Sequence, residues 1–234
     1  MSKTVDEIVE FIKREAHVSN GGVVIGMSGG VDSAVVAALA RRALEPHRIQ
    51  LVMMPCNDLV DMYAMAYAEE LEMGSMTISI GGTFNKMMDS GVFELLASCS
   101  NLKARLRMCV LYGIANTREA LVVGTTNKSE WEVGYFTKYG DGGCDIEPII
   151  HLYKTQVYEI AEELGVPDEI IKRAPSADLY PGQTDEGEMG VSYAVLDEVL
   201  QGRKDKATAT QLASINTRRM LTEHKRHLPR GVRG

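Results

Sequence analysis

The segment GMSGGVDS, residues 26–33, combines three glycines, two serines and one aspartate. Glycine lets the backbone approach an anion closely and adopt positive φ, while the hydroxyls of Ser28 and Ser33 can donate hydrogen bonds. If a helix begins at this point, its free N–H groups and its dipole favour an anion in the same place. The segment therefore predicts a phosphate-binding turn.

Two common nucleotide motifs do not fit this turn. Gly21 and Gly26 have the spacing of GxxxxGK[ST], but Met27 stands where the lysine is required, and the spacing of GxGxxG is also missing. Asp32 would repel a phosphate unless a divalent cation lay between them, so it is a candidate Mg²⁺ ligand. The alternative is an ordinary strand-to-helix turn in which Asp32 is a favourable acid in the first helical turn.

A second polar segment spans residues 122–149. Thr125 and Thr126 are candidates for a helix N-cap or for hydroxyls that face phosphate, and Glu130 follows about one turn later. Glu130 could therefore supply the second carboxylate of a Mg²⁺ site. The string FTKYGDGG, residues 136–143, places a lysine and an aspartate among three glycines, whereas a merely structural loop rarely needs both charges.

The elements that must position these segments alternate along the chain. Short apolar runs typical of buried parallel strands are separated by helical patterns, and they cover residues 23–27, 49–55, 76–80 and 120–125. This alternation predicts an α/β fold with a doubly wound, mostly parallel sheet and helices on both faces. Ligands of such sheets bind beyond the carboxyl ends of the strands, so both polar segments are expected to face one crevice.

Composition restricts the class of protein further. The chain has 234 residues, 45% of them hydrophobic and 24% charged, which suits one large or two small globular domains. No apolar run reaches the ~20 residues of a membrane span, so a cytoplasmic protein is expected. The four cysteines form no CxxC pair, which favours free thiols over a zinc site. A net charge of −7 argues against a large nucleic-acid footprint and favours a small-molecule partner.

The first turn resembles the SGGxDS pyrophosphate loop of the N-type ATP pyrophosphatases, which explains the missing lysine. In that superfamily the loop holds the departing pyrophosphate while a substrate oxygen is adenylated at the α-phosphate. The superfamily also includes GMP, argininosuccinate and asparagine synthetases. Five further strings occur in this chain in the same order as in one family of that superfamily. They are GTTNKSE, GYFTKYGDGG, LYKTQV, PSADL and TEHK. With them, most of the chain resembles the ammonia-dependent NAD synthetases.

This resemblance implies an adenine nucleotide alpha-hydrolase-like fold and a carbon–nitrogen ligase that uses ATP and Mg²⁺. Such enzymes adenylate the nicotinate carboxylate of deamido-NAD, and ammonia then displaces AMP, so that the products are NAD, AMP and pyrophosphate.

The resemblance also implies roles for individual residues. Asp32, Glu130 and Lys154 would be catalytic, and Asp32 and Glu130 would hold Mg²⁺. The residues implied to bind ATP are Gly26, Met27, Ser28, Gly29, Gly30, Val31, Asp32, Ser33, Thr125, Lys154 and Ser176. Those implied to bind deamido-NAD are Arg105, Lys138, Asp145, His224 and Lys225.

Some of these residues have simpler alternatives. Arg105 lies in an amphipathic helical pattern, where arginines usually face solvent. Lys154 begins a predicted helix over residues 153–164, an unfavourable place for a cation unless a phosphate is near. Ser176 replaces the threonine expected in PSADL, and the connection in residues 53–71 is shorter than is usual in the family.

The resemblance covers residues 1–234 as a single NAD synthetase domain, with a helical and basic tail at about 203–234. A glutaminase domain is not expected, so the resemblance implies free ammonia or a separate amidotransferase as the source of nitrogen. A homodimer is expected from the resemblance and from the apolar helical stretch 84–116, although that stretch could instead be core. The basic tail either is a frayed, solvated terminus or brings His224 and Lys225 to deamido-NAD.

Two other functions share parts of this pattern. A tRNA-thiolating or lysidine-forming enzyme has a similar pyrophosphate loop, but it predicts a cysteine pair or an appended basic domain, and the sequence contains neither. A non-catalytic module that binds adenine nucleotides would not need Asp32, Glu130 and Lys138 together. Both alternatives are therefore less consistent with the residues than the ligase.

Overall fold

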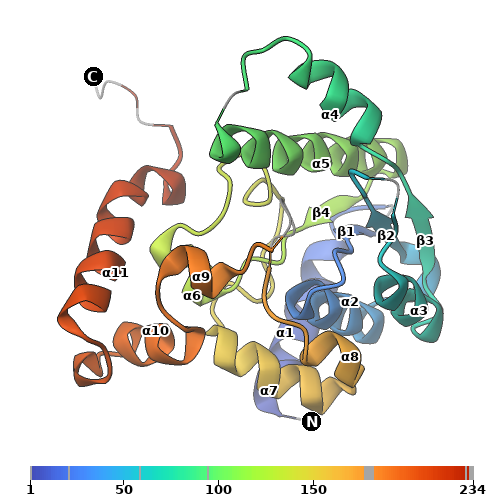
Figure 1. Cartoon of the computed structure of the whole chain (residues 1–234). Helices are drawn as coiled ribbons and strands as arrows, with labels where there is room; N and C mark the ends of the chain where they lie inside the picture. Colours follow the sequence, from blue (N-terminus) through green and yellow to red (C-terminus); the bar gives the residue numbers. More distant parts are fainter. Residues whose placement is uncertain are drawn as a thin grey trace.

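The computed structural model describes residues 2–20, 22–57, 59–93, 95–176, 182–229 and 231. Its centre is a four-stranded, all-parallel sheet in the order β3-β2-β1-β4 (Figure 1). The strands are β1 (Val23–Gly26), β2 (Ile49–Met53), β3 (Gly74–Thr77) and β4 (Leu121–Val123). The four predicted strands and the parallel, doubly wound sheet are confirmed.

Helices cover both faces of the sheet, as the sequence predicts. Successive side chains of a strand point to opposite faces. On one face, α1 (Lys3–Ala16), α2 (Val31–Ala43), α7 (Lys154–Leu164) and α8 (Asp168–Ile171) share a core with Ile25 and Leu51. On the other face, Val24, Val52 and Val122 pack with side chains of α5 (Leu96–Arg118). Figure 1 shows α5 on one side of the sheet and α1, α2 and α7 on the other.

The predicted helical stretch 84–116 is two helices. α4 (Gly81–Met88) ends before Gly91, whose φ of +71° cannot continue a helix, and α5 begins at Leu96. Two further short elements are α3 (Met62–Glu70), whose Ala64 and Tyr67 pack in the core shared with α1 and α2, and a 3-10 helix η1 (Pro46–Arg48). None of the helices in the described ranges is both long enough and apolar enough to cross a membrane.

A smaller group of helices packs beside the sheet layers. It consists of α6 (Lys128–Val133), α9 (Asp185–Met189), α10 (Tyr193–Leu200) and α11 (Ala209–Leu221). The side chains of Val133, Met189, Leu196 and Ile215 form a core of its own. Two 3-10 helices, η2 (Lys204–Lys206) and η3 (Glu223–Arg226), lie on either side of α11, so much of the predicted tail is helical. Of the PSADL motif, residues 177–179 lie outside the described residues.

Candidate active site

Both polar segments meet at the carboxyl edge of the sheet. β1 and β4 are neighbours, whereas the chain continues from β1 to β2 on the other side. The order of the strands therefore reverses at β1, and ligands of open α/β sheets bind at such a point. A hydrogen bond of 2.9 Å from Asn127 Nδ2 to Asp32 Oδ1 joins the two segments directly. The two segments therefore meet at this edge of the sheet, whereas the crevice itself stays a prediction.

The turn after β1 is held in shape by its own hydroxyls. Gly29 has a φ of +82°, which suits glycine, and the N–H of Gly30 donates to Ser28 Oγ at 3.3 Å. The buried Ser33 donates from its hydroxyl to the carbonyl of Gly30 at 2.9 Å. Met27 is buried and its N–H bonds to Val52 O at 2.9 Å, so it fixes the turn to the sheet. The turn is therefore preformed for an anion.

The three residues predicted to be catalytic lie together. Lys154 is only 2% exposed, its Nζ donates to the carboxylate of Asp32, and it is 3.6 Å from Glu130 Oε1. Burial acts to lower the pKa of Lys154, but the two carboxylates outweigh it and leave that pKa above its ordinary value. Burial, with the charge of Asp32 added, raises the pKa of Glu130 to about 8. This is a desolvated charge cluster typical of functional sites.

The same cluster can accept a divalent cation. Asp32 and Glu130 already stabilise one positive charge between them, and carboxylate oxygens are the protein ligands that Mg²⁺ prefers. In the part of the chain that the structure describes, no three His, Cys, Asp or Glu side chains are grouped to hold a metal ion. Mg²⁺ is commonly held by one or two carboxylates together with substrate phosphates and water, so two carboxylates beside a phosphate turn fit it.

Side chains that the sequence did not reveal support this cluster from the C-terminal helices. Tyr193 donates from its hydroxyl to Glu130 Oε1 at 3.2 Å and is 3.1 Å from Asp185 Oδ2. Asp197 accepts from the hydroxyl of Ser129 and from the N–H of Thr155 at 2.9 Å. No local motif marks these residues, because their role depends on packing between distant segments.

Four of the five residues predicted to bind deamido-NAD form a second cluster. Arg105 Nη2 is 3.4 Å from the carbonyl oxygen of Lys138, and Lys138 Nζ donates to the carbonyl oxygen of His224 at 2.6 Å. Lys225 Nζ donates to two carbonyl oxygens of the segment 134–136 at 2.7 and 2.5 Å. The tail up to this point is docked on the chain and is not frayed. The structure thus brings together α5, the glycine-rich segment and the tail.

The fifth residue, Asp145, has a different position. Its Oδ2 accepts from the N–H of Val122 at 2.8 Å and its Oδ1 from the hydroxyl of Tyr112 at 3.1 Å. Both oxygens are engaged within the protein, and they tether the segment after the glycines to β4. Of the remaining predicted ATP residues, Thr125 is half-buried in the turn after β4 and Ser176 is exposed.

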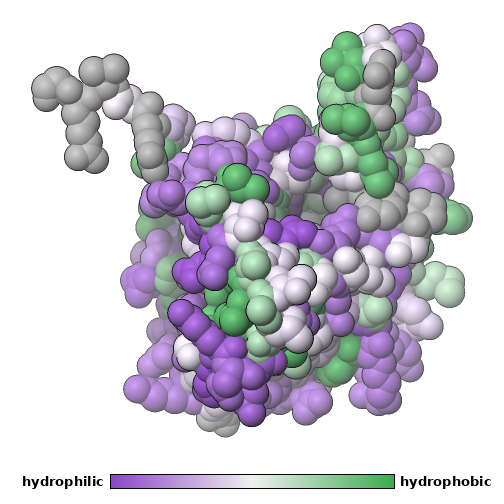
Figure 2. Space-filling view, turned by 60° about the vertical axis from the view of Figure 1, so that its left-hand side comes forward, coloured by the Kyte–Doolittle hydropathy of each residue, from purple (hydrophilic) through white to green (hydrophobic). Residues whose placement is uncertain are grey.

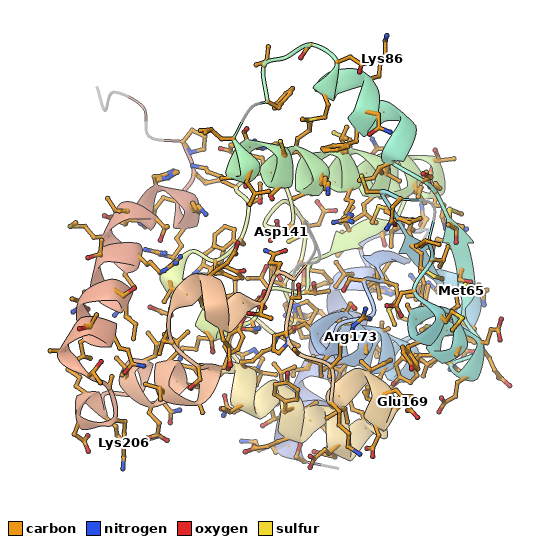
Figure 3. All side chains as sticks on the ribbon, in the orientation of Figure 1. Met65, Lys86, Asp141, Glu169, Arg173 and Lys206 are labelled. Carbon is orange, nitrogen blue, oxygen red and sulfur yellow. The ribbon has the colours of Figure 1, made fainter. Side chains whose placement is uncertain are left out.

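Two further carboxylates near these clusters were not assigned from the sequence. Asp141 accepts from the N–H of Thr137 at 3.0 Å, and Figure 3 shows it between α5 and α9. Desolvation by the surrounding protein raises the pKa of Asp141, although the residue as a whole is exposed. Glu147 accepts from the N–H of Thr126 at 3.1 Å, and burial raises its pKa to about 7. Asp141 lies within the string GDGG, residues 140–143, and its charge there could have marked it as a candidate site residue.

Glu147 also lies against Gly124, the residue that follows β4. A Cβ atom at Gly124 would lie 2.4 Å from the carboxyl carbon of Glu147, so a larger residue there would require the carboxylate to move. The acid is therefore packed directly on the backbone of the turn that carries Thr125.

Known proteins with similar sequences and structures agree with this arrangement. Residues 4–229 match the family model described as NAD synthase. The NH(3)-dependent NAD(+) synthetase of Thermoplasma acidophilum is 43% identical over 96% of this chain and 95% of its own length. The NMN synthetase of Francisella tularensis superposes with a TM-score of 0.92 at 37% identity, over 98% of this chain and 97% of that one. An NH3-dependent NAD synthetase of Campylobacter jejuni gives 0.83 at 28% identity, over 100% of both chains.

Proposed function

Because the chain belongs to the NAD synthase family, we propose that it is an ammonia-dependent ligase that converts deamido-NAD to NAD with ATP. The observation that carries this proposal is the cluster of Lys154, Asp32 and Glu130 beside the Ser-Gly-Gly turn. A buried cation between two carboxylates, next to a preformed anion site, suits a reaction in which a polyphosphate is cleaved.

The chemistry requires an activated carboxylate. The nicotinate oxygen attacks the α-phosphorus of ATP, the bond from that phosphorus to the bridging oxygen of pyrophosphate breaks, and an acyl-adenylate results. Ammonia then adds to the acyl carbon, loses a proton, and AMP leaves with the former carboxylate oxygen. Residues 26–33 would hold the pyrophosphate, and Thr125, Lys154 and Ser176 other parts of ATP. Asp32 and Glu130 would hold Mg²⁺, which supplies neutralising charge to the phosphates when bound.

We assign the second cluster to deamido-NAD. The basic side chains of this cluster come from segments that are far apart in the chain, and they belong to Arg105, Lys138, His224 and Lys225. The pyrophosphate of a dinucleotide is anionic, so basic side chains suit its binding. Asp145 would serve this end by holding its segment against β4, because both of its oxygens already accept hydrogen bonds.

A second copy of the chain is the proposed partner. An open groove of about 510 Å³ is lined by side chains of β3 and α5 and of the residues beside them: Met76, Ile78, Val110, Gly113, Ile114, Thr117 and Arg118. Hydrophobic side chains are also exposed after α4, including Val92 and Leu95. Figure 2 shows hydrophobic residues on the projection at its upper right. Exposed apolar surface of this kind favours association. Residues 1–234 would then act as one synthetase domain with its tail at 203–234, supplied with free ammonia or by an amidotransferase.

A second candidate substrate follows from the structural neighbours. The Francisella NMN synthetase superposes better than the Campylobacter NAD synthetase, with a TM-score of 0.92 against 0.83. The alternative function is therefore amidation of the corresponding mononucleotide by the same adenylation chemistry.

One experiment separates these functions. The purified protein is incubated with ATP, Mg²⁺, ammonium and either deamido-NAD or nicotinate mononucleotide, and the products are identified by mass spectrometry. NAD, AMP and pyrophosphate from deamido-NAD are expected. A higher kcat/KM with the mononucleotide would select the second candidate, and formation of ADP would contradict adenylation.

A further inference from the structure

A fixed negative charge lies against the phosphate turn. Asp61 precedes α3, and its Oδ1 accepts from the N–H groups of Tyr63 and Ala64, both at 3.0 Å, so it is the N-cap of that helix. A Cβ atom built on Gly29 would be only 2.6 Å from Asp61 Cγ. The helix therefore holds a carboxylate in contact with the glycine of the turn, where it opposes the binding of any anion.

Arg173 is placed to cancel this charge. It belongs to the segment after α8, and its Nη1 donates to Asp61 Oδ2. The Arg173 side chain is 44% exposed and that of Asp61 20% exposed. Figure 3 shows Arg173 in the middle of the molecule, above α2 in this view. The guanidinium and the carboxylate carry opposite charges, so the pair presents no net charge to the turn.

The pair connects two parts of the site that are distant in sequence. Asp61 lies in the short connection of residues 53–71 after β2, and Arg173 lies in the segment that leads to Ser176. Neither residue contacts the cluster of Lys154, Asp32 and Glu130 through any interaction that the described residues display.

We propose that Arg173 is a positioning residue for ATP: by neutralising Asp61, it keeps the Ser-Gly-Gly turn attractive to the polyphosphate of ATP. This inference rests on the proposed function, since it needs ATP as the ligand of the turn. Asp61 is needed as the cap of α3, and Arg173 removes the electrostatic cost of placing that acid beside the turn. The role is electrostatic, and an uncharged cap at position 61 makes the arginine unnecessary.

The test is a double-mutant cycle on ATP binding, measured by calorimetry with Mg²⁺ present. Arg173→Gln is expected to weaken ATP binding about tenfold. An opposite charge within about 4–6 Å typically changes the equilibrium between the charged and neutral forms of a group by at least that factor. Asp61→Asn keeps an oxygen that can cap α3, so it is expected not to weaken binding. The double variant is expected to bind within about twofold of the unsubstituted protein. In turnover, Arg173→Gln should raise the KM for ATP and leave kcat nearly unchanged.

A matched control is the neighbouring Lys172→Gln. Lys172 pairs with Asp168 on the exposed surface and not with Asp61, so the same loss of one positive charge should leave ATP binding unchanged. Thermal unfolding of each variant checks that it is folded.

Three results would overturn the inference. They are unchanged ATP binding by folded Arg173→Gln, a double variant as weak as Arg173→Gln alone, and an equal loss in Lys172→Gln. If the unsubstituted protein binds no ATP, the assignment of the turn to ATP is wrong, and the inference falls with it.

Discussion

The two clusters of the site are built in different ways. The proposed ATP end combines two continuous segments, residues 26–33 and 124–130, that follow neighbouring strands of one sheet, with Lys154 at the start of α7. The dinucleotide end is assembled from α5, the glycine-rich segment 134–143 and the tail after α11. The proposed chemistry at the phosphate thus lies at the edge of the sheet, whereas the proposed recognition of the rest of the substrate depends on docking of the tail.

The charged side chains of the two clusters also differ in their exposure to water. Lys154 is buried between Asp32 and Glu130, where charges interact strongly and the loss of one partner leaves an uncompensated charge. Arg105 and Lys138 are more accessible to water, where salt screens their interactions. Substitutions at the ATP end should therefore act mainly on kcat, and those at the dinucleotide end mainly on KM.

The largest effect is expected from Asp32→Asn and Glu130→Gln. Each variant removes one carboxylate that would bind Mg²⁺ with little change of shape, and loss of one oriented electrostatic group typically lowers the rate ~10²-fold or more. Steady-state turnover at saturating ATP measures this, with circular dichroism to check the fold. Near-normal turnover of either variant at low Mg²⁺ would remove that residue from the proposed metal site.

A truncation after Leu221 tests the other cluster. It removes Lys225 with its bonds to the segment 134–136, and the KM for deamido-NAD should rise about tenfold, or ~1.4 kcal/mol. ATP binding by calorimetry should change little, because the ATP end does not include the tail. Unchanged deamido-NAD kinetics in a folded truncation would leave the tail without a role in binding.

A separate effect, on stability and not on kinetics, is expected from Glu147 at the turn after β4. Burial raises the pKa of Glu147 from 4.5 to about 7, so the folded protein keeps a proton that the unfolded chain releases between these values. Stability should therefore fall as pH rises from about 4.5 to about 7, by at most ~3 kcal/mol. Glu147→Gln should flatten this dependence in melting temperatures measured from pH 4.5 to 8. An equally steep curve for the variant would assign the dependence to other groups.

The last prediction concerns the oligomeric state of the protein in solution. If a second copy covers the groove on α5, light scattering at micromolar concentrations should give about twice the mass of one chain. Val110→Lys should shift this towards one chain by burying a charge in the interface. Since α5 also carries Arg105, a parallel rise in the KM for deamido-NAD would link the dinucleotide end to the dimer. A monomeric unsubstituted protein would reject the dimer.

The sequence determined the parts of the protein that depend on local patterns. Apolar runs placed the four strands, and the glycines and hydroxyls of residues 26–33 placed the turn. The motifs shared with the family identified Glu130 and Lys154 as candidate site residues. In a parallel sheet with crossover helices, the segments that follow the strands lie at one edge of the sheet by topology alone. The proximity of Lys154 to Asp32 and Glu130 could therefore be predicted, although the ion pair itself could not.

Only the tertiary structure decided which distant side chains complete the two clusters. The bond from Tyr193 to Glu130, the pairing of Arg173 with Asp61 and the docking of Lys225 on the segment 134–136 each join residues more than 60 positions apart. Such contacts depend on how the helices of the C-terminal half pack against the sheet layers, and side-chain chemistry along the chain does not encode their partners. The physical reason is that a local sequence fixes backbone conformation and the exposure of a face, whereas partners across space are fixed by the packing of the whole core.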